Sequence, residues 1–232
     1  LQARVEHPHV CRVYEAGEWR GQAFIAMQLI QGRTLSSMAR DLSFEEKLRV
    51  MIQVCEGVHA AHQEGLVHRD LKPTNLMVER RPDGLHATVL DFGLARFGTT
   101  KGITQSGMVM GTMHYMSPEQ ARGADTDLDR RSDLYALGIC LYELFAGDVP
   151  FGELKGVDVL AATLDQDPPT LRFRASVPLD LDTVVMKCLE KVPGRRYDSA
   201  RALGDELHRI LLGDPILARR ATARERAVRW MR

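Results

Sequence analysis

The sequence lacks the features that would assign it early to a membrane, secreted or nucleic-acid-binding class. Its 31 lysines and arginines balance 31 aspartates and glutamates, so bulk charge favours neither nucleic acid nor an acidic partner. Its four cysteines form no C-x-x-C pair, which excludes the usual zinc pattern and a disulfide framework and predicts reduced thiols. No signal peptide opens the chain, and the longest apolar stretch, 134–146, is too short for a bilayer. We therefore expect a cytoplasmic protein.

What remains is the composition of a globular protein. With 44% hydrophobic and 27% charged residues over 232 positions, the chain can bury a sizeable core as one large domain or two small ones. Two β-type runs come first, at 10–14 and 23–29, joined by a turn at 17–21. Ser43-x-x-Glu46 then fits a capping box, and a helix is predicted from there to Gly65.

The rest of the chain alternates short strands, a loop and helices. Strand-like runs are predicted at 76–78 and 88–90 around a polar turn at 80–84. Residues 98–117 have no clean period and predict a long loop. Helices are predicted at 133–145, 157–164, 181–190 and 199–212. The first of these is apolar on nearly every face, which is typical of a buried helix.

Three motifs carry the chemistry. Residues 68–75 read His-Arg-Asp-Leu-Lys-Pro-Thr-Asn, residues 91–93 read Asp-Phe-Gly, and Gly111-Thr112 precedes Met-Ser-Pro-Glu at 116–119. In order, these resemble the catalytic loop, the metal-binding motif and the end of the activation segment of protein kinases. An isolated Asp-Phe-Gly means little, but the three in order are specific. The chain is identified as a member of the protein kinase family over about residues 7–212, and Ser-Pro-Glu-Gln looks like the eukaryotic-like kinases of bacteria.

The resemblance implies a role for each polar residue of these motifs. Asp70 would accept the proton of the substrate hydroxyl, and Lys72 would contact the γ-phosphate of ATP. Asn75 and Asp91 would hold Mg²⁺, which prefers oxygen ligands. Thr112 would hydrogen-bond Asp70 and Lys72, and both Lys72 and Thr112 are typical of serine/threonine kinases. Without their neighbours, Asp70 and Asn75 would be better explained as turn or cap residues.

Residues 26–32 look like the hinge that binds adenine in this family. Met27 falls at the gatekeeper position, and the main chain of Gln28 and Ile30 would supply the adenine hydrogen bonds. Met77 falls where a side chain packs under the adenine ring. The alternative for this segment is a plain β-strand and its exit turn.

Further positions are expected to support the loop. By family match, Asp133 would accept hydrogen bonds from the catalytic-loop backbone. Glu119 would pair with Arg196 to brace the substrate-docking segment, residues 111–119. His68 and Phe92 are expected to pack in the hydrophobic spine rather than to take part in chemistry.

Two groups of residues invite other interpretations. His59 and His62 have helical spacing but no third ligand, so we interpret them as core or surface histidines rather than as a metal pair. Thr104 and Ser106 lie in the loop where related kinases autophosphorylate, and a phosphate there could bind Arg69.

Other kinase motifs do not occur in the 232 residues. There is no G-x-G-x-x-G and no V-A-I-K lysine, and the chain begins at Leu1 as if inside a helix. We therefore expect an α+β kinase fold with a remnant of the small lobe and hinge at 1–31, the large lobe at 32–213 and a basic tail at 214–232. We also expect impaired activity for the chain as it stands.

The predicted function is transfer of the ATP γ-phosphate to serine or threonine hydroxyls of protein substrates, with ATP and Mg²⁺ as cofactors and no nucleic-acid partner. A pseudokinase or scaffold module is the first alternative, and a small-molecule kinase is the second. Residues 219–232 hold six arginines and one glutamate, which fits a solvated helix extension or a segment leading to a membrane tether beyond the C-terminus.

Overall fold

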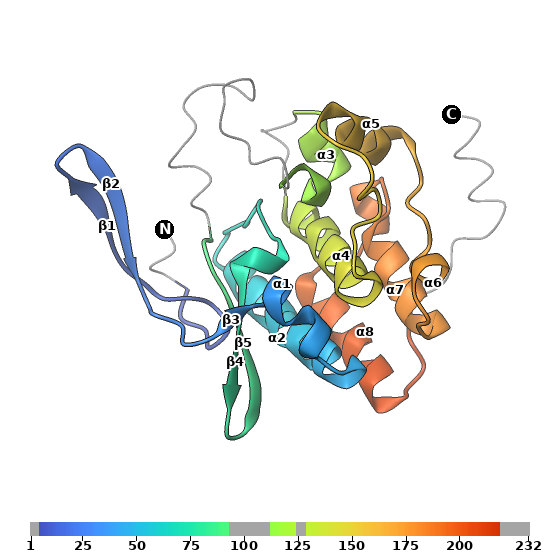
Figure 1. Ribbon diagram of the computed structural model, residues 1–232, viewed down its shortest axis with the longest axis horizontal. Helices are drawn as coiled ribbons and strands as arrows, with labels where there is room; N and C mark the ends of the chain where they lie inside the picture. Colours follow the sequence, from blue (N-terminus) through green and yellow to red (C-terminus); the bar gives the residue numbers. More distant parts are fainter. Residues whose placement is uncertain (1–4, 93–111, 124–128, 219–232) are drawn as a thin grey trace.

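The computed structural model describes residues 5–92, 112–123 and 129–218 (Figure 1). A β-hairpin, here called the arm, projects from a body that consists of a second small sheet and a group of helices. Outside the described residues lie Gly93, Gly111, the candidate phosphorylation sites Thr104 and Ser106, and the basic segment 219–232.

The arm consists of β1 (Val13–Trp19) and β2 (Gln22–Met27), which pair antiparallel. Its turn is the two-residue loop Arg20-Gly21, in which φ is 51° and 80°. Positive φ at both turn positions matches the right-handed twist of the two strands. The predicted turn at 17–21 is therefore wrong in extent, because β1 continues through Trp19.

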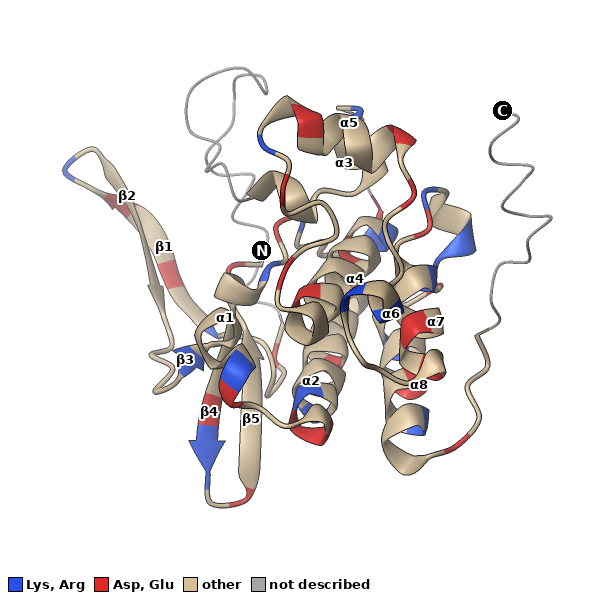
Figure 2. Ribbon diagram, turned by 45° about the vertical axis from the view of Figure 1, so that its right-hand side comes forward, with Lys and Arg blue, Asp and Glu red and all other residues tan. Residues whose placement is uncertain are grey.

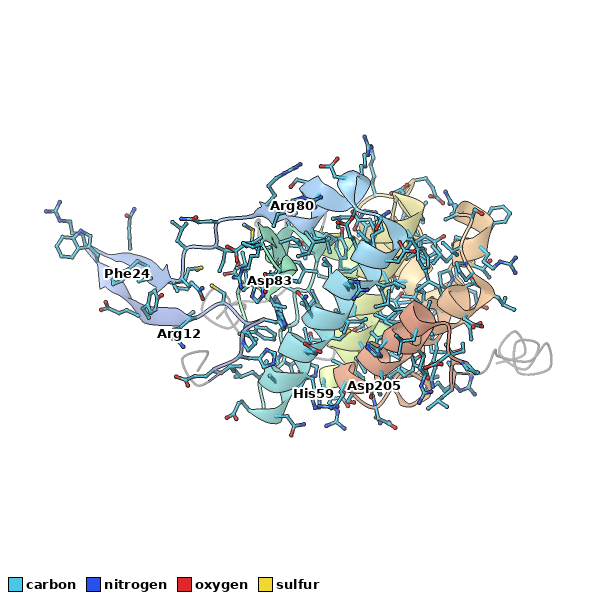
Figure 3. All side chains as sticks on the ribbon, turned by 90° about the horizontal axis from the view of Figure 1, so that it is seen from below. Arg12, Phe24, His59, Arg80, Asp83 and Asp205 are labelled. Carbon is cyan, nitrogen blue, oxygen red and sulfur yellow. The ribbon has the colours of Figure 1, made fainter. Side chains whose placement is uncertain are left out.

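The arm is largely exposed. Tyr14 is 64% exposed, Trp19 67% and Phe24 38%. Figure 3 shows Phe24 on the arm, well away from the helices. Backbone pairing rather than a buried face therefore sets the register of this two-stranded sheet.

The second sheet has the strand order β3–β4–β5, formed by β3 (Arg33–Thr34), β4 (Leu76–Arg81) and β5 (Gly84–Val89). β4 and β5 are longer than the predicted runs at 76–78 and 88–90. Residues of the predicted polar turn pair across the hairpin instead, as Arg80 does with Leu85. Only residues 82–83 are left for the turn.

Helices make up most of the body. The described helices are α1 (Leu35–Met38), α2 (Phe44–Gln63), α3 (Pro118–Ala121), α4 (Arg130–Ala146), α5 (Val157–Asp165), α6 (Leu171–Arg174), α7 (Leu179–Cys188) and α8 (Ala200–Leu212), with 3-10 turns η2 (Ala39–Asp41), η3 (Pro73–Asn75), η5 (Thr112–Tyr115) and η6 (Pro193–Arg195). The predicted long helices all occur, with ends shifted by a few residues. The four-residue helices escape prediction because they are too short to show a period.

The capping box predicted at the start of α2 is confirmed. Ser43 Oγ accepts from Glu46 N at 3.2 Å, and Glu46 Oε2 accepts from Ser43 N at 2.8 Å. Gly65, with φ of 72°, lies just past the helix and ends it as predicted.

The centre of the helical group is α4. Every residue from 132 to 142 is buried, which confirms the prediction of a helix covered on nearly all faces. α2, α6 and α7 pack against it, and α2 also packs along α8. Gly138 permits the close approach of α7, because a Cβ there would lie 2.5 Å from Cys188 Cβ.

Residues 7–11, here called the junction segment, join the arm to the body. Cys11 N donates to Val89 O at 2.8 Å, and Val89 N donates to His9 O at 2.9 Å. This segment also lies close to α2, because a Cβ at Gly57 would be 2.5 Å from His9 O. The end of β5 is therefore fixed to the base of the arm.

All four cysteines lie in the described part of the chain, are buried and form no disulfide there. Among the described residues, no helix is both long and apolar enough to cross a membrane.

A cluster of histidines lies where the junction segment meets β5 and α2. The ring of His9 lies 4.7 Å from the ring of His86 and 5.5 Å from that of His7, measured between centroids. His9 Nδ1 donates to Ala87 O at 2.7 Å, and Glu56 Oε2 lies 3.5 Å from Nε2. Burial lowers the pKa of His9 below its ordinary 6.5, and the neighbouring histidines act in the same direction. The pKa of His7 is also lowered, again mainly by burial.

The histidine cluster should make the stability of the fold depend on pH. Because the folded pKa of His9 is lowered, the unfolded chain binds a proton first as the pH falls through about 6.5, and the free energy of unfolding should decrease from there downward. His9→Asn keeps a donor for Ala87 O but cannot be protonated, so it should flatten this dependence. Chemical denaturation between about pH 5 and 8 measures it. The exposed His208→Asn serves as the control, and equal slopes for the two variants would contradict the expectation.

Candidate active site

The predicted catalytic loop lies between α2 and β4, and its polar side chains gather around one carboxylate. Lys72 Nζ donates to Asp70 Oδ2 at 2.8 Å and to Thr112 Oγ1 at 3.1 Å. Asn75 Nδ2 donates to Asp70 O at 2.9 Å and lies 3.4 Å from Oδ2. Within the described ranges no direct bond joins Thr112 to Asp70, so the expected bond between these two residues is wrong. Lys72 bonds to both of them instead.

The second carboxylate oxygen of Asp70 is left open. Asp70 Oδ1 is buried and has no hydrogen-bond partner among the described residues. Buried polar atoms without a partner are rare, and such an exception points to a catalytic or ligand-binding role. An ionised carboxylate only accepts hydrogen bonds, so this oxygen can receive a hydroxyl proton.

The end of β5 brings Asp91 to the loop. Leu90 N donates to Asn75 O at 2.9 Å, so Asp91 follows directly after a residue bonded to Asn75. The φ angles of Asp91 and Arg69 are 59° and 69°. Such angles cost a non-glycine residue about 1–3 kcal/mol and are concentrated at active sites. The backbone is therefore held away from its preferred conformation within the loop, at Arg69, and after β5, at Asp91.

The oxygen atoms of Asn75 and Asp91 suit Mg²⁺. Because Asn75 Nδ2 donates to Asp70, its Oδ1 is the atom available to a cation. No cluster of three or more His, Cys, Asp or Glu side chains among the described residues could hold a metal by protein ligands alone. Mg²⁺ keeps several waters and binds through one or two carboxylates plus substrate phosphates, so a small oxygen set fits this ion.

Asp133, at the start of α4, accepts hydrogen bonds from the backbone of the catalytic loop, as predicted. Its Oδ2 accepts from His68 N and its Oδ1 from Arg69 N, both at 2.8 Å. A third partner, His62 Nε2, lies 2.7 Å from Oδ2. Asp133 is fully buried, and burial would raise its pKa, but the bonds from His62 and the loop amide hold the pKa below its usual value. The carboxylate is therefore ionised and fully engaged.

The histidine and phenylalanine of the motifs pack as expected. His68 is buried, its Nε2 donates to Leu90 O at 2.7 Å, and its ring meets that of Phe92 edge-on at 4.7 Å. These contacts join the loop to the end of β5. The side chain of His62 is likewise buried. Its bond to Asp133 could not be read from the sequence.

The predicted brace between Glu119 and Arg196 is present. Arg196 donates through both terminal nitrogens to the two carboxylate oxygens of Glu119, at 2.7 and 2.8 Å. Ser132 Oγ donates to the same carboxylate at 2.8 Å. The Arg196 side chain is fully buried and stacks over Tyr135. Burial opposes ionisation of Glu119, but Arg196 prevails and lowers its pKa.

The candidate hinge lies between the two sheets. Met27 ends β2, and Gln28 N donates to Arg12 O at 2.8 Å. Met77 lies on β4 opposite Thr34. Gly32 brings the two regions together, because a Cβ there would lie 2.5 Å from the carbonyl oxygen of Val78. The segment that holds Ile30 therefore passes beside the strand that holds Met77.

The arrangement of these motifs agrees with the comparisons with known proteins. Residues 1–207 match the family model described as the protein kinase domain. The chain belongs to the protein kinase family. Curated relatives of the kinase include the serine/threonine-protein kinase PknB of Mycobacterium leprae, 35% identical over 222 residues that cover 92% of this chain and 35% of PknB. Another is the serine/threonine-protein kinase PrkC of Bacillus subtilis, 32% identical over 225 residues that cover 95% of this chain and 34% of PrkC.

Solved structures give the same result for the fold. The crystal structure of the PknI kinase domain from Mycobacterium tuberculosis has a TM-score of 0.70 and 28% identity, covering 89% of this chain and 74% of that one. The kinase is thus a serine/threonine kinase catalytic domain of the eukaryotic-like bacterial type, and the predicted α+β kinase fold is confirmed. It spans about a third of the length of the curated relatives it matches. Kinases of this family generally use ATP and Mg²⁺.

Removing one partner of the brace should destabilise the kinase severely. Glu119→Ala would leave Arg196 buried without its ion pair, at a cost of about 3–5 kcal/mol out of a total stability of about 5–15 kcal/mol. Asp41→Ala is the matched control, because it breaks the Arg33–Asp41 pair, in which both side chains are more than half exposed. Thermal melting compares the two variants. Equal melting temperatures for both would mean that the buried pair contributes no more than the exposed one.

Proposed function

We propose that Asp70 is the general base of a transfer of the ATP γ-phosphate to serine or threonine hydroxyls of proteins. The observation that carries this proposal is the open, buried Oδ1 of Asp70 beside an Oδ2 bound by Lys72. Lys72 and, at the longer distance of 3.4 Å, Asn75 hold Oδ2 of the carboxylate, so one oxygen is anchored while the other can accept the hydroxyl proton. Thr112 orients Lys72 from the docking segment.

The remaining site residues would bind the cofactors. The ammonium group of Lys72 would lie near the transferred phosphate, and the oxygens of Asn75 and Asp91 would ligate Mg²⁺. When bound, Mg²⁺ supplies charge neutralisation on the nucleotide phosphates. Met27, the main chain of Gln28 and Ile30, and Met77 would surround the adenine of ATP.

The proposal includes a division of the chain at the hinge. Residues 1–31 would belong to the small lobe, 32–213 to the large lobe and 214–232 to a basic tail. The start of β3 at Arg33 and the end of α8 at Leu212, followed by Gly213 with φ of 75°, support these limits. We place the domain in the cytoplasm, with protein substrates and no nucleic acid, and keep a membrane tether beyond residue 232 as part of the proposal.

Replacing the base should abolish most turnover without unfolding the protein. Asp70→Asn in the natural full-length protein should lower kcat by about 10²- to 10⁴-fold, the usual contribution of general base catalysis. Transfer of radiolabelled phosphate to a generic protein substrate measures it, and ATP binding should persist. Asp83→Asn, in the exposed β4–β5 turn, is the control. Near wild-type turnover of Asp70→Asn would remove Asp70 from the mechanism, and no transfer by the wild-type protein would favour a scaffold role.

A further inference from the structure

The side chain of Gln120 connects two segments that are far apart in the sequence. Its Nε2 donates to Arg69 O at 2.8 Å, across 51 positions. Its Oε1 accepts from Ser117 N at 3.0 Å, and Gln120 N in turn donates to Ser117 Oγ at 3.4 Å. One amide group therefore completes the capping box of α3 and at the same time reaches the catalytic loop.

The carbonyl that Gln120 contacts belongs to the peptide unit that leads into Asp70. A peptide unit is planar, so Arg69 O and Asp70 N move as one rigid group. Gln120 holds the oxygen side of this group, and His68 Nδ1, 3.3 Å from Asp70 N, accepts on the nitrogen side. Arg69 itself has φ of 69°, a conformation that persists only where the surroundings enforce it.

The helix that carries Gln120 is firmly anchored. Glu119, its neighbour, is held by the two terminal nitrogens of Arg196 and by Ser132 Oγ. Pro118 and Ser117 are both buried. Gln120 therefore donates to the loop from a fixed position, although α3 is only four residues long.

The need for both a donor and an acceptor explains why this position holds glutamine. A capping box accepts glutamate or glutamine at its third helical position, and the box of α2 uses Glu46. A glutamate at 120 could accept from Ser117 N but would turn its second oxygen toward the Arg69 carbonyl. Only the amide offers an acceptor to one group and a donor to the other.

We propose that Gln120 is a positioning residue, which ties the substrate-docking segment to the catalytic loop and fixes the peptide unit before Asp70. The inference rests on the role proposed above for Asp70. Gln120 links the segment that would contact the protein substrate to Asp70, which would accept the proton of the substrate hydroxyl.

The test compares Gln120→Met and Gln120→Glu with Glu46→Met. Gln120→Met removes the cap and the bond to Arg69, whereas the conservative Gln120→Glu keeps the cap but replaces that bond by a carboxylate oxygen facing the Arg69 carbonyl oxygen. Glu46→Met removes the corresponding capping-box side chain of α2, far from the loop. Hydrogen exchange of the amides at 66–76 is read by mass spectrometry in the full-length protein. Both Gln120 variants should exchange faster there than wild type, and Glu46→Met should not.

The second measurement is kinetic. Both Gln120 variants should lower kcat, by about 3- to 10-fold for Gln120→Met, the effect of losing the one bond that reaches the catalytic loop. KM for ATP should stay unchanged, since the hinge is not touched. Unchanged exchange at 66–76, or a kcat equal to that of Glu46→Met, would overturn the proposal. If the wild-type protein transferred no phosphate, the proposed function would fail, while hydrogen exchange would still decide whether Gln120 ties the loop.

Discussion

The Asp133 carboxylate, in the buried first turn of α4, accepts hydrogen bonds from the His68 and Arg69 amides and bonds to His62. A buried charge is stable only while it is paired and hydrogen-bonded, so the loop cannot leave Asp133 without a large cost. This constraint sustains the positive φ of Arg69 and, through it, the position of Asp70. The geometry of the candidate site depends on this one carboxylate.

The start of α4 organises a second polar cluster as well. Ser132, the residue before Asp133, donates to Glu119, which Arg196 holds from the other side. Ser132 thus contacts the docking segment and Asp133 contacts the catalytic loop, and Gln120 joins these two segments directly. Figure 2 shows α4 in the middle of the body, with α3 and α5 on one side of it and α6 and α7 beside it.

Several features were predictable because they depend on neighbours in the chain. The capping box of α2 needs only Ser43 and Glu46, and the burial of α4 follows from a run of apolar residues. The family resemblance supplied contacts such as Glu119 with Arg196, which no spacing rule gives. The predicted turn of the arm was too long, because the sequence does not show that Arg20 adopts a positive φ and closes the hairpin in two residues. The bonds that His62 makes to Asp133 and Gln120 makes to Arg69 could not be predicted, since these partners lie far away along the chain.

By itself, the sequence determined the identity of the chemical groups, the order of the motifs and the family, because the reaction requires those residue types in that order. Only the tertiary structure decided which atoms meet. Among the described residues it gives Asp70 Oδ1 no hydrogen-bond partner, places Lys72 between Thr112 and Asp70, and brings His62 into contact with Asp133. The physical reason is that burial and hydrogen-bond partners are set by packing between distant segments, and a local sequence pattern carries no information about which distant side chain will satisfy a given donor or acceptor.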